Sequence, residues 1–410
     1  MRAAVYRGPN KLRIETVPVP RIGPHELLVK VAVCGVCPTD IKKIVHGTVP
    51  PPRIFGHETA GTIARIGARV RDFKPGDRVA LHHHIPCMDC HACRHRAFAQ
   101  CAQYKRTGIT AGFEPAGGGF AEYVRVMPFV IPGVVRIPAR NSFEEGAMLE
   151  PVNTVLKAVK RLSLLPGDSV LVAGQGPIGL MFTKLLQLEG MKVLASDLMD
   201  SRLALAKKFG AKWTVKQSKV ESRKSISSLS RRTGEGRGEG QSEENSNIQH
   251  PTTNIQQPKS TSSSLSHRMG EGRGEGSDFA LRTSPLALPS ASHLDAAVVA
   301  VPSDSAFTYA LAAVRPAGQI LLFAHTRRGA MTQVDLASVC VDEKDLLGSY
   351  SSDVTLQQEV ARLVFGRKLD VRSLITHRFP LEQAAAAIEL AAKPTPESLK
   401  ILVTHGNQSQ

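Results

Sequence analysis

The sequence predicts an α/β protein in which a mostly-β unit precedes a doubly wound parallel sheet. Residues 1–80 hold short Val- and Ile-rich segments broken by Gly and Pro, which is typical of strands joined by turns. From about Leu171, strand-like and helix-like segments alternate, and this alternation indicates a parallel sheet with helices on both faces. At 410 residues the chain is long enough for two domains with separate cores.

The individual elements follow from local patterns. In the first part, strands are expected within LLVKVAV (27–33), ETAGTIARIG (58–67) and GDRVALH (76–82). In the second part, residues 170–197 predict strand, Gly-rich turn, helix and strand, and a helix is expected within SRLALAKKFGA (201–211). The remaining expected elements are buried strands at 295–302 and 318–324, helices within 356–366 and 381–392, and a short strand at 400–405.

One segment, residues 218–292, does not fit this alternation. It is dominated by Ser, Gly, Gln, Asn, Thr and Pro, and SLSRRTGEGRGEG (228–240) recurs nearly unchanged as SLSHRMGEGRGEG (264–276). Such a composition cannot bury enough apolar surface to offset the entropy of ordering it. We therefore expect a disordered insertion that interrupts the second domain.

Composition argues against several broad classes of protein. Hydrophobic residues make up 42% and charged residues 21%, as in globular domains. No apolar stretch approaches the ~20 residues of a membrane span. The first 20 residues lack the apolar core and cleavage site of a secretion signal, so we expect a cytoplasmic protein with no membrane partner. The formal charge of +16 comes from scattered Lys and Arg, which favours a solvated basic surface over a nucleic-acid partner.

A tight cysteine cluster carries the clearest chemical signal. Its spacing is C-x2-C-x2-C-x7-C, and its members are Cys87, Cys90, Cys93 and Cys101. Clustered cysteines without a secretion signal favour metal over disulfides, and a closed four-sulfur site is typical of structural zinc. A DNA-binding zinc ribbon is the competing interpretation, because residues 94–96 beside the cluster are basic.

A second, scattered set of metal-binding residue types lies outside that cluster. It consists of Cys37 in CGVCPTD, His57 in GHETAG and Glu150 in LEP. Each residue alone has an ordinary structural explanation. Together they resemble the three-ligand set that leaves one zinc position open for chemistry, because turns and helix breaks can bring distant residues together. Ser142 and Glu145 predict a capping box for the helix that precedes Glu150.

The Gly-rich turn after the strand at Leu171 predicts a dinucleotide site. The residues expected to line the cofactor are Gly174, Gly176, Pro177, Ile178 and Gly179. Glycines there allow a tight turn and close approach of a pyrophosphate to the N-terminus of the next helix. Asp197 ends the following strand, where it would accept hydrogen bonds from a ribose and repel a 2′-phosphate, so NAD is favoured. Arg202 lies nearby and leaves NADP as the alternative.

On these motifs the chain resembles the zinc-dependent medium-chain dehydrogenases, the family of alcohol, sorbitol (L-iditol) and threonine dehydrogenases. The matching motifs are CGVCPTD, GHETAGTIARIG, the four-cysteine spacing, GGGFAEY (117–123), LEP, GQGPIG and Asp197. The resemblance implies a Rossmann cofactor domain and a mostly-β GroES-like catalytic domain with a structural zinc lobe. The implied bounds are 1–152 for the catalytic domain, about 86–102 for its lobe, 153–350 for the cofactor domain around the insertion, and 351–410 for a return to the catalytic domain.

The resemblance also implies roles for single residues. Cys37, His57 and Glu150 look like the ligands of a catalytic zinc. Glu58 is expected near that zinc or its water, Asp40 is expected to orient His57, and Thr39 is expected to bind the substrate hydroxyl and pass on its proton. Two zinc ions per chain, NAD, and a homodimer or homotetramer are implied as well.

Two positions depart from the family pattern. Lys42 stands where many relatives have a His that ends the proton relay, and Pro38 stands where many have Gly. Proton exit through water is then the alternative route.

The expected function is hydride transfer from a small secondary alcohol or polyol to NAD. Three alternatives remain open: a threonine-type amino-alcohol dehydrogenase, a zinc- and NAD-binding homologue impaired by the insertion, and a DNA-binding zinc protein.

Overall fold

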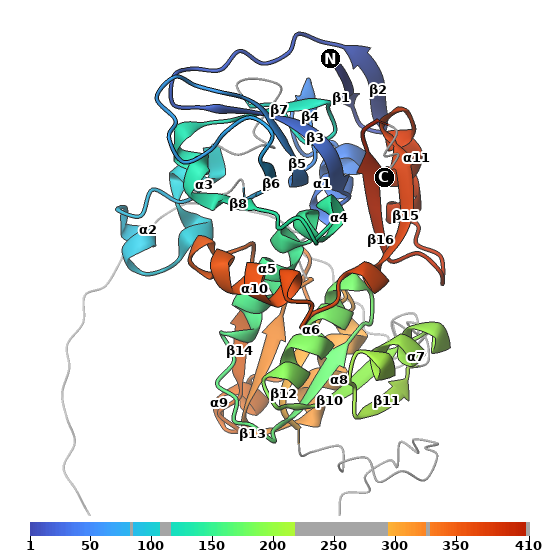
Figure 1. The fold of residues 1–410 in the computed structure, drawn as a ribbon. Helices are drawn as coiled ribbons and strands as arrows, with labels where there is room; N and C mark the ends of the chain where they lie inside the picture. The colour runs from blue at the N-terminus through green and yellow to red at the C-terminus, as the bar shows by residue number, and fades with distance from the viewer. Residues whose placement is uncertain (83–84, 107–115, 218–293, 325–328, 407–410) are drawn as a thin grey trace, which may run out of the picture. The chain divides into compact units, whose positions relative to one another are not determined.

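The computed structural model describes residues 1–82, 85–106, 116–217, 294–324 and 329–406. The insertion expected at 218–292 lies outside these described residues. Helices and strands carry the labels of Figure 1.

Two sheets are built from the first part of the chain together with its last strands. The larger has the order β15-β16-β3-β5-β6-β8, with β7 paired to β3, and the smaller has the order β2-β1-β4. Only β15 and β16 run parallel in these sheets. The strands are β1 (Arg2–Gly8), β2 (Lys11–Thr16), β3 (Leu27–Gly35), β4 (Arg53–Ile54), β5 (Glu58–Ile66), β6 (Arg78–Leu81), β7 (Tyr123–Val126), β8 (Val134–Arg136), β15 (Ile375–Pro380) and β16 (Lys400–Thr404).

A six-stranded sheet forms the second part, and all its neighbouring strands are parallel in the order β11-β10-β9-β12-β13-β14. Its strands are β9 (Ser169–Ala173), β10 (Lys192–Asp197), β11 (Trp213–Lys216), β12 (Leu294–Val299), β13 (Val314–Leu322) and β14 (Asp345–Gly348). Side chains alternate between two apolar cores, since Val170 and Val172 face one and Leu171 the other. The sheet is therefore buried on both faces, as a doubly wound fold requires.

Helices cover both faces of that sheet and link the other elements (Figure 1). They are α1 (Pro38–His46), α2 (His91–Arg94), α3 (Ala102–Arg106), α4 (Phe143–Ala147), α5 (Leu149–Val159), α6 (Pro177–Leu188), α7 (Asp200–Lys208), α8 (Asp304–Ala313), α9 (Leu336–Cys340), α10 (Gln357–Phe365) and α11 (Ala384–Ala392). Short 3₁₀ turns span Phe98–Gln100, Pro128–Gly133, Val354–Leu356, Arg372–Leu374 and Leu381–Gln383. Helix α6 packs beside β9 and β10, and α8 beside β12 and β13.

The predicted fold class is confirmed: a mostly-β part and a doubly wound parallel sheet. Strands and helices also lie where the sequence patterns placed them, including the final strand β16. This strand pairs with β3, so the end of the chain joins the sheet of its first part. The domain boundaries proposed at 152/153 and 350/351 stay a prediction.

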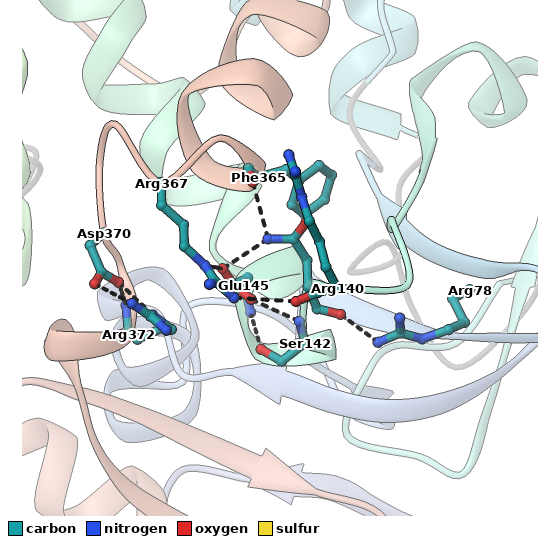
Figure 2. A network of polar contacts seen from close by, with 9 residues as sticks. Arg78, Arg140, Ser142, Glu145, Phe365, Arg367, Asp370 and Arg372 are labelled. Carbon is teal, nitrogen blue, oxygen red and sulfur yellow. Dashed lines mark hydrogen bonds and ion pairs between the residues drawn. The ribbon is translucent and has the colours of Figure 1, made fainter.

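A polar network joins the start of α4 to the turn after α10 (Figure 2). The predicted capping box is present, because Ser142 Oγ accepts from Glu145 N at 3.1 Å and Ser142 N donates to Glu145 Oε2 at 2.8 Å. Arg367 and Asn141 both donate to Glu145 Oε1, at 3.1 and 2.9 Å. The network ties together residues more than 200 positions apart in the sequence.

In the part of the chain that the structure describes, no helix combines the length and the apolarity that crossing a membrane would take.

Candidate functional site

Strand register brings Cys37 and His57 to one place. Strands β3 and β5 pair antiparallel with Gly35 opposite Glu58. Cys37 lies two residues after Gly35 and His57 one residue before Glu58, so both side chains emerge at the same end of the strand pair. Cys37 is also the N-cap residue of α1, which fixes its backbone.

Asp40 holds His57 from the first turn of α1. The Asp40 carboxylate is fully buried, accepts from Cys37 N at 3.2 Å through Oδ2, and places Oδ1 3.3 Å from His57 Nδ1. Burial alone would raise the pKa of Asp40, but the charge and hydrogen bond of His57 hold it below its ordinary value. Burial alone would lower the pKa of His57, but Asp40 and the Cys37 thiol raise it well above its ordinary value. These surroundings favour positive charge, which a divalent cation would also supply.

Three side chains form a compact group of possible metal ligands: Cys37, His57 and Glu58, with one ligand atom each and all within 4.8 Å of one another. Glu150 is not in that group. It is buried in the first turn of α5. Burial raises the pKa of Glu150 to about 7. The charge of His57 acts to lower this pKa, whereas the charge of Glu58 acts to raise it. Glu150 thus lies in electrostatic reach of the group, and its predicted ligand role stays a prediction.

Lys400 is a buried residue at this site that sequence reasoning missed. Strand β16 pairs with β3 with Leu402 opposite Gly35, so Lys400 lies beside the residues that follow Gly35. Its amine forms an ion pair with Glu58 and donates to Val36 O at 3.0 Å. A Cβ on Gly35 would lie 1.8 Å from Glu58 Oε2, so glycine leaves the room for the pair. A lysine opening the apolar strand KILVT was the available signal.

The four predicted cysteines also converge. Cys87, Cys90, Cys93 and Cys101 place one sulfur each within 4.8 Å of the others. The sulfur–sulfur distances are 3.5 Å for Cys90–Cys93, 3.7 Å for Cys87–Cys101 and 3.9 Å for Cys87–Cys93. Zinc–sulfur bonds of about 2.3 Å in a tetrahedron give sulfur–sulfur edges of about 3.8 Å. The cluster therefore has the dimensions of a closed zinc site.

The backbone around these cysteines favours thiolates unequally. Cys87 N donates to Cys101 Sγ at 3.4 Å, and Cys90 N donates to Cys87 Sγ at 3.3 Å. Burial opposes ionisation of Cys101, yet the N–H groups of Cys87 and Tyr104 lower its pKa to about 6. Burial, together with hydrogen bonding among the thiols, raises the pKa of Cys93 to about 12. A cation among the four sulfurs would relieve that difference by stabilising every thiolate.

The free space around the glycines of the Gly-rich turn fits a bound dinucleotide. It follows β9, where the strand order of the parallel sheet reverses. A Cβ on Gly174 would lie 2.2 Å from Val301 Cγ1, and one on Gly179 would lie 1.8 Å from Gly174 O. A Cβ on Gly176 would meet no atom within 4 Å. The outer two glycines are thus required by packing, whereas Gly176 faces open space at the N-terminus of α6, where a pyrophosphate would fit.

Asp197 and Arg202 lie at the other predicted cofactor positions but are engaged differently. Asp197 ends β10 and accepts from Gln175 N at 2.6 Å and from Met199 N at 3.0 Å, so its carboxylate is fixed beside the turn. Arg202 is buried and donates through Nη2 to the carbonyl oxygens of Thr395, at 3.2 Å, and of Ser398.

The proposed proton route begins on α1. Thr39 is half-buried in the first turn of α1, two residues after Cys37, and Lys42 follows one turn later on the same helix. The role of Thr39 in passing on the proton stays a prediction, and so does the exit of the proton through water.

Comparison with known proteins adds to this geometry. Residues 23–138 match the family described as the alcohol dehydrogenase GroES-like domain. The chain is 33% identical over 217 residues to a sorbitol dehydrogenase of Bacillus subtilis (strain 168), which covers 52% of this chain and 60% of that protein. It is 31% identical over 225 residues to D-xylulose reductase A of Aspergillus niger, and the match covers 53% of this chain and 60% of that protein. The chain therefore matches less than two thirds of the length of these relatives.

Residues 23–138 are therefore a GroES-like domain of the kind found in alcohol dehydrogenases. Solved structures show the dehydrogenase fold over nearly the whole length of the chain. The alcohol dehydrogenase TADH from Thermus sp. ATN1 is 24% identical, covers 99% of this chain and 100% of its own, and superposes with a TM-score of 0.73. The galactitol-1-phosphate dehydrogenase from Escherichia coli is 23% identical, with 98% and 100% covered and a TM-score of 0.72.

Proposed function

We propose that this protein is a zinc-dependent medium-chain dehydrogenase that transfers a hydride from a secondary alcohol or polyol to NAD, with zinc at the reacting centre. The observation that carries the proposal is the convergence of Cys37 and His57, with the buried carboxylates of Glu58 and Glu150 in electrostatic reach, in a chain that also holds an open Gly-rich turn. Relatives named sorbitol dehydrogenase and D-xylulose reductase support polyols as the substrate class.

The two clusters of ligand residues fit two different zinc ions. The four-cysteine cluster would hold a closed structural ion, while Cys37 and His57 with one carboxylate would leave a position open for substrate. We keep Glu150 as that carboxylate, because Glu58 already has the Lys400 amine as its counter-ion. Asp40 would occupy His57 Nδ1 and so make Nε2 the nitrogen that binds metal.

When bound, zinc would acidify the substrate hydroxyl and the nicotinamide would accept the hydride. The chain's own residues orient the reactants and carry the proton. Thr39 Oγ1 would accept the hydroxyl proton and release it toward solvent, beside Lys42 on the same helix. NAD is proposed over NADP because Asp197 would repel a 2′-phosphate, while Arg202 Nη2 is committed to backbone oxygens.

A substrate screen with zinc analysis tests the proposal. Reduction of NAD is measured over polyols, sugars, secondary alcohols and hydroxy-amino acids. We expect turnover with a polyol or secondary alcohol. Cys37→Ser should abolish that turnover and lose one of two zinc ions per chain with NAD binding unchanged, and Cys340→Ser at an exposed cysteine is the control.

The other outcomes identify the alternatives. Turnover confined to hydroxy-amino acids would indicate the threonine type, and two zinc ions without turnover on any substrate would indicate an impaired homologue. Salt-dependent binding of duplex DNA would instead support the zinc-ribbon interpretation. Full activity of purified Cys37→Ser would refute the catalytic-zinc assignment.

We further propose a homodimer or homotetramer that uses the edge of the parallel sheet. In the described residues β14 pairs only with β13, so its outer edge is open. Apolar side chains are exposed in α9, just after it and in β14: Leu336 is 75% exposed, Val341 is 77% exposed and Leu346 is 38% exposed. Open edges with exposed apolar residues favour association. Replacing Val341 with Lys should shift sedimentation toward the monomer.

A further inference from the structure

Helix α5 carries Glu150 in its first turn and is bound along one side to residues 348–353. Asn153 and Lys157 are four positions apart, so they lie on one face of α5, and Arg161 continues that line just beyond the helix. The contacts are Asn153 Nδ2 to Asp353 O (2.9 Å), Asp353 N to Asn153 Oδ1 (2.7 Å), Lys157 Nζ to Tyr350 O (2.8 Å) and Arg161 Nη1 to Gly348 O. Residues 348–353 therefore determine where α5, and with it Glu150, is held.

The four-sulfur lobe contacts the same segment through Tyr104. The Tyr104 ring is buried among Cys93, Phe98 and Cys101 in the apolar centre of the lobe. Its hydroxyl lies in hydrogen-bond contact with Ser351 Oγ, 247 positions further along the chain. One residue thus belongs to the lobe by its ring and to the 348–353 segment by its hydroxyl.

The backbone of Ser351 has an uncommon conformation, which is a reason to ask what its contact with Tyr104 does. Its φ is +61°, a left-handed value that glycine adopts more easily than serine. Residues other than glycine that are held in this backbone conformation cluster at functional positions. The next residue, Ser352, is fully buried with its Oγ 3.3 Å from His82 Nε2, so the segment is held from a third side.

We propose that Tyr104 is a positioning residue through which the four-sulfur lobe sets the place of Glu150. The path runs from the lobe through the Tyr104 hydroxyl to Ser351, along the backbone to Asp353, and through Asn153 into α5. Asn153 is fully buried and lies three residues, or about one turn, after Glu150. The lobe then helps to position a residue of the proposed catalytic site, in addition to stabilising its own part of the chain. The catalytic meaning of this path rests on the proposed function, whereas its mechanical part does not.

Tyr104→Phe tests the path because it keeps the buried ring and removes only the hydroxyl. Tyr309→Phe, a half-buried tyrosine in α8, is the matched control. Hydrogen exchange of the full chain with zinc bound should become faster in residues 149–159 and 348–353 and stay unchanged in 87–101. Zinc should remain at two per chain. Because one hydrogen bond is lost, kcat should fall about 3- to 10-fold with the KM for NAD unchanged.

A double-mutant cycle with Ser351→Gly separates positioning from general loosening. Ser351→Gly should reproduce the exchange pattern and the drop in kcat, and the double variant should be no worse than either single one. Additive effects, or faster exchange confined to the lobe or spread over the whole chain, would overturn the proposal. If no alcohol is turned over at all, the proposed function fails, yet the exchange pattern and the cycle still decide the path.

Discussion

At the scale of single residues, two buried carboxylates in electrostatic reach of His57 differ in their contact with Lys400. Glu58 has the Lys400 amine as an ion-pair partner, while burial raises the pKa of Glu150 to about 7. Glu58 and Lys400 are almost fully buried, so neither charge is well solvated. Removing one member of such a pair leaves the other charge buried and uncompensated.

Lys400→Met should therefore destabilise the protein by about 3 kcal/mol. Thermal unfolding of the zinc-loaded protein measures the effect as a lower Tm, and the double variant Glu58→Gln/Lys400→Met should recover much of the loss. Lys216→Met is the control, because its pair with Asp200 is exposed and such pairs contribute about 0–1 kcal/mol. A Tm for Lys400→Met equal to that of the wild type would show that the pair carries no such energy.

Gly176 and Gly179 allow a matched comparison of binding and folding. Gly176→Ala adds a methyl group where no atom lies within 4 Å, so Tm should not change, but NAD affinity should fall about 10-fold or more because the pyrophosphate loses its close approach. Gly179→Ala places its Cβ 1.8 Å from Gly174 O, so Tm should fall. Calorimetric titration with NAD and thermal unfolding measure the two effects. Equal loss of Tm in both variants would contradict the separate roles.

At the scale of elements, the spacing of residues in the sequence predicted helices, strands and caps, but it did not predict contacts between distant residues. The capping box at Ser142 and Glu145 follows from a three-residue spacing, and the strand and helix periods are equally local. The partner Arg367 could not be predicted, because it reaches Glu145 only after the turn that follows α10 closes on α4 (Figure 2). The sequence around Glu145 and the sequence around Arg367 do not indicate that these two residues come into contact.

The Glu145 network should make stability depend on pH. Burial alone would raise the pKa of Glu145, but hydrogen bonds from Arg367, Ser142 N and Asn141 hold it below its ordinary value. Since an unfolded Glu titrates near about 4.3, the network stabilises the fold above that pH. The stabilisation is lost as pH falls through the lower, folded pKa.

Glu145→Gln should consequently unfold at a lower temperature than wild type at neutral pH, and this gap should narrow as the pH falls below about 4.3. Thermal unfolding at a series of pH values measures it. Glu144→Gln is the neighbouring control, because the Glu144–Arg378 pair lies nearer the surface. A gap that stays constant across the series would mean that ionisation of Glu145 is not involved.

At the scale of the whole molecule, the fold class and the four-cysteine cluster were predictable from the sequence, but the arrangement of side chains around Cys37 and His57 was not. Cys37 and His57 come together through the β3–β5 register, and Lys400 joins them through the β16–β3 register. Register depends on which strands become neighbours, and that choice is made by packing across the whole sheet. Glu58 lying closer than Glu150 to the Cys37–His57 pair is a consequence of that three-dimensional choice.

The sheet order also predicts how short the link between β11 and β12 can become. Strands β10 and β9 lie between them, so the link must cross about 14 Å at strand spacings of about 4.8 Å. Because both strands are parallel, it must also return along the roughly 20 Å of β12. The link cannot follow the straight diagonal through the sheet, and a parallel crossover that passes over one face takes a dozen or more residues.

Replacing residues 218–293 with a helix-forming linker of about 16 residues should therefore preserve the fold, with two zinc ions per chain and Tm within a few degrees of the full chain. A linker of about six Gly and Ser residues should abolish the cooperative transition, because β11 and β12 cannot both keep their places. Zinc analysis and thermal unfolding of both shortened chains beside the full chain decide this. Equal stability of the short-linker chain would show that β11 and β12 are not separated by two strands.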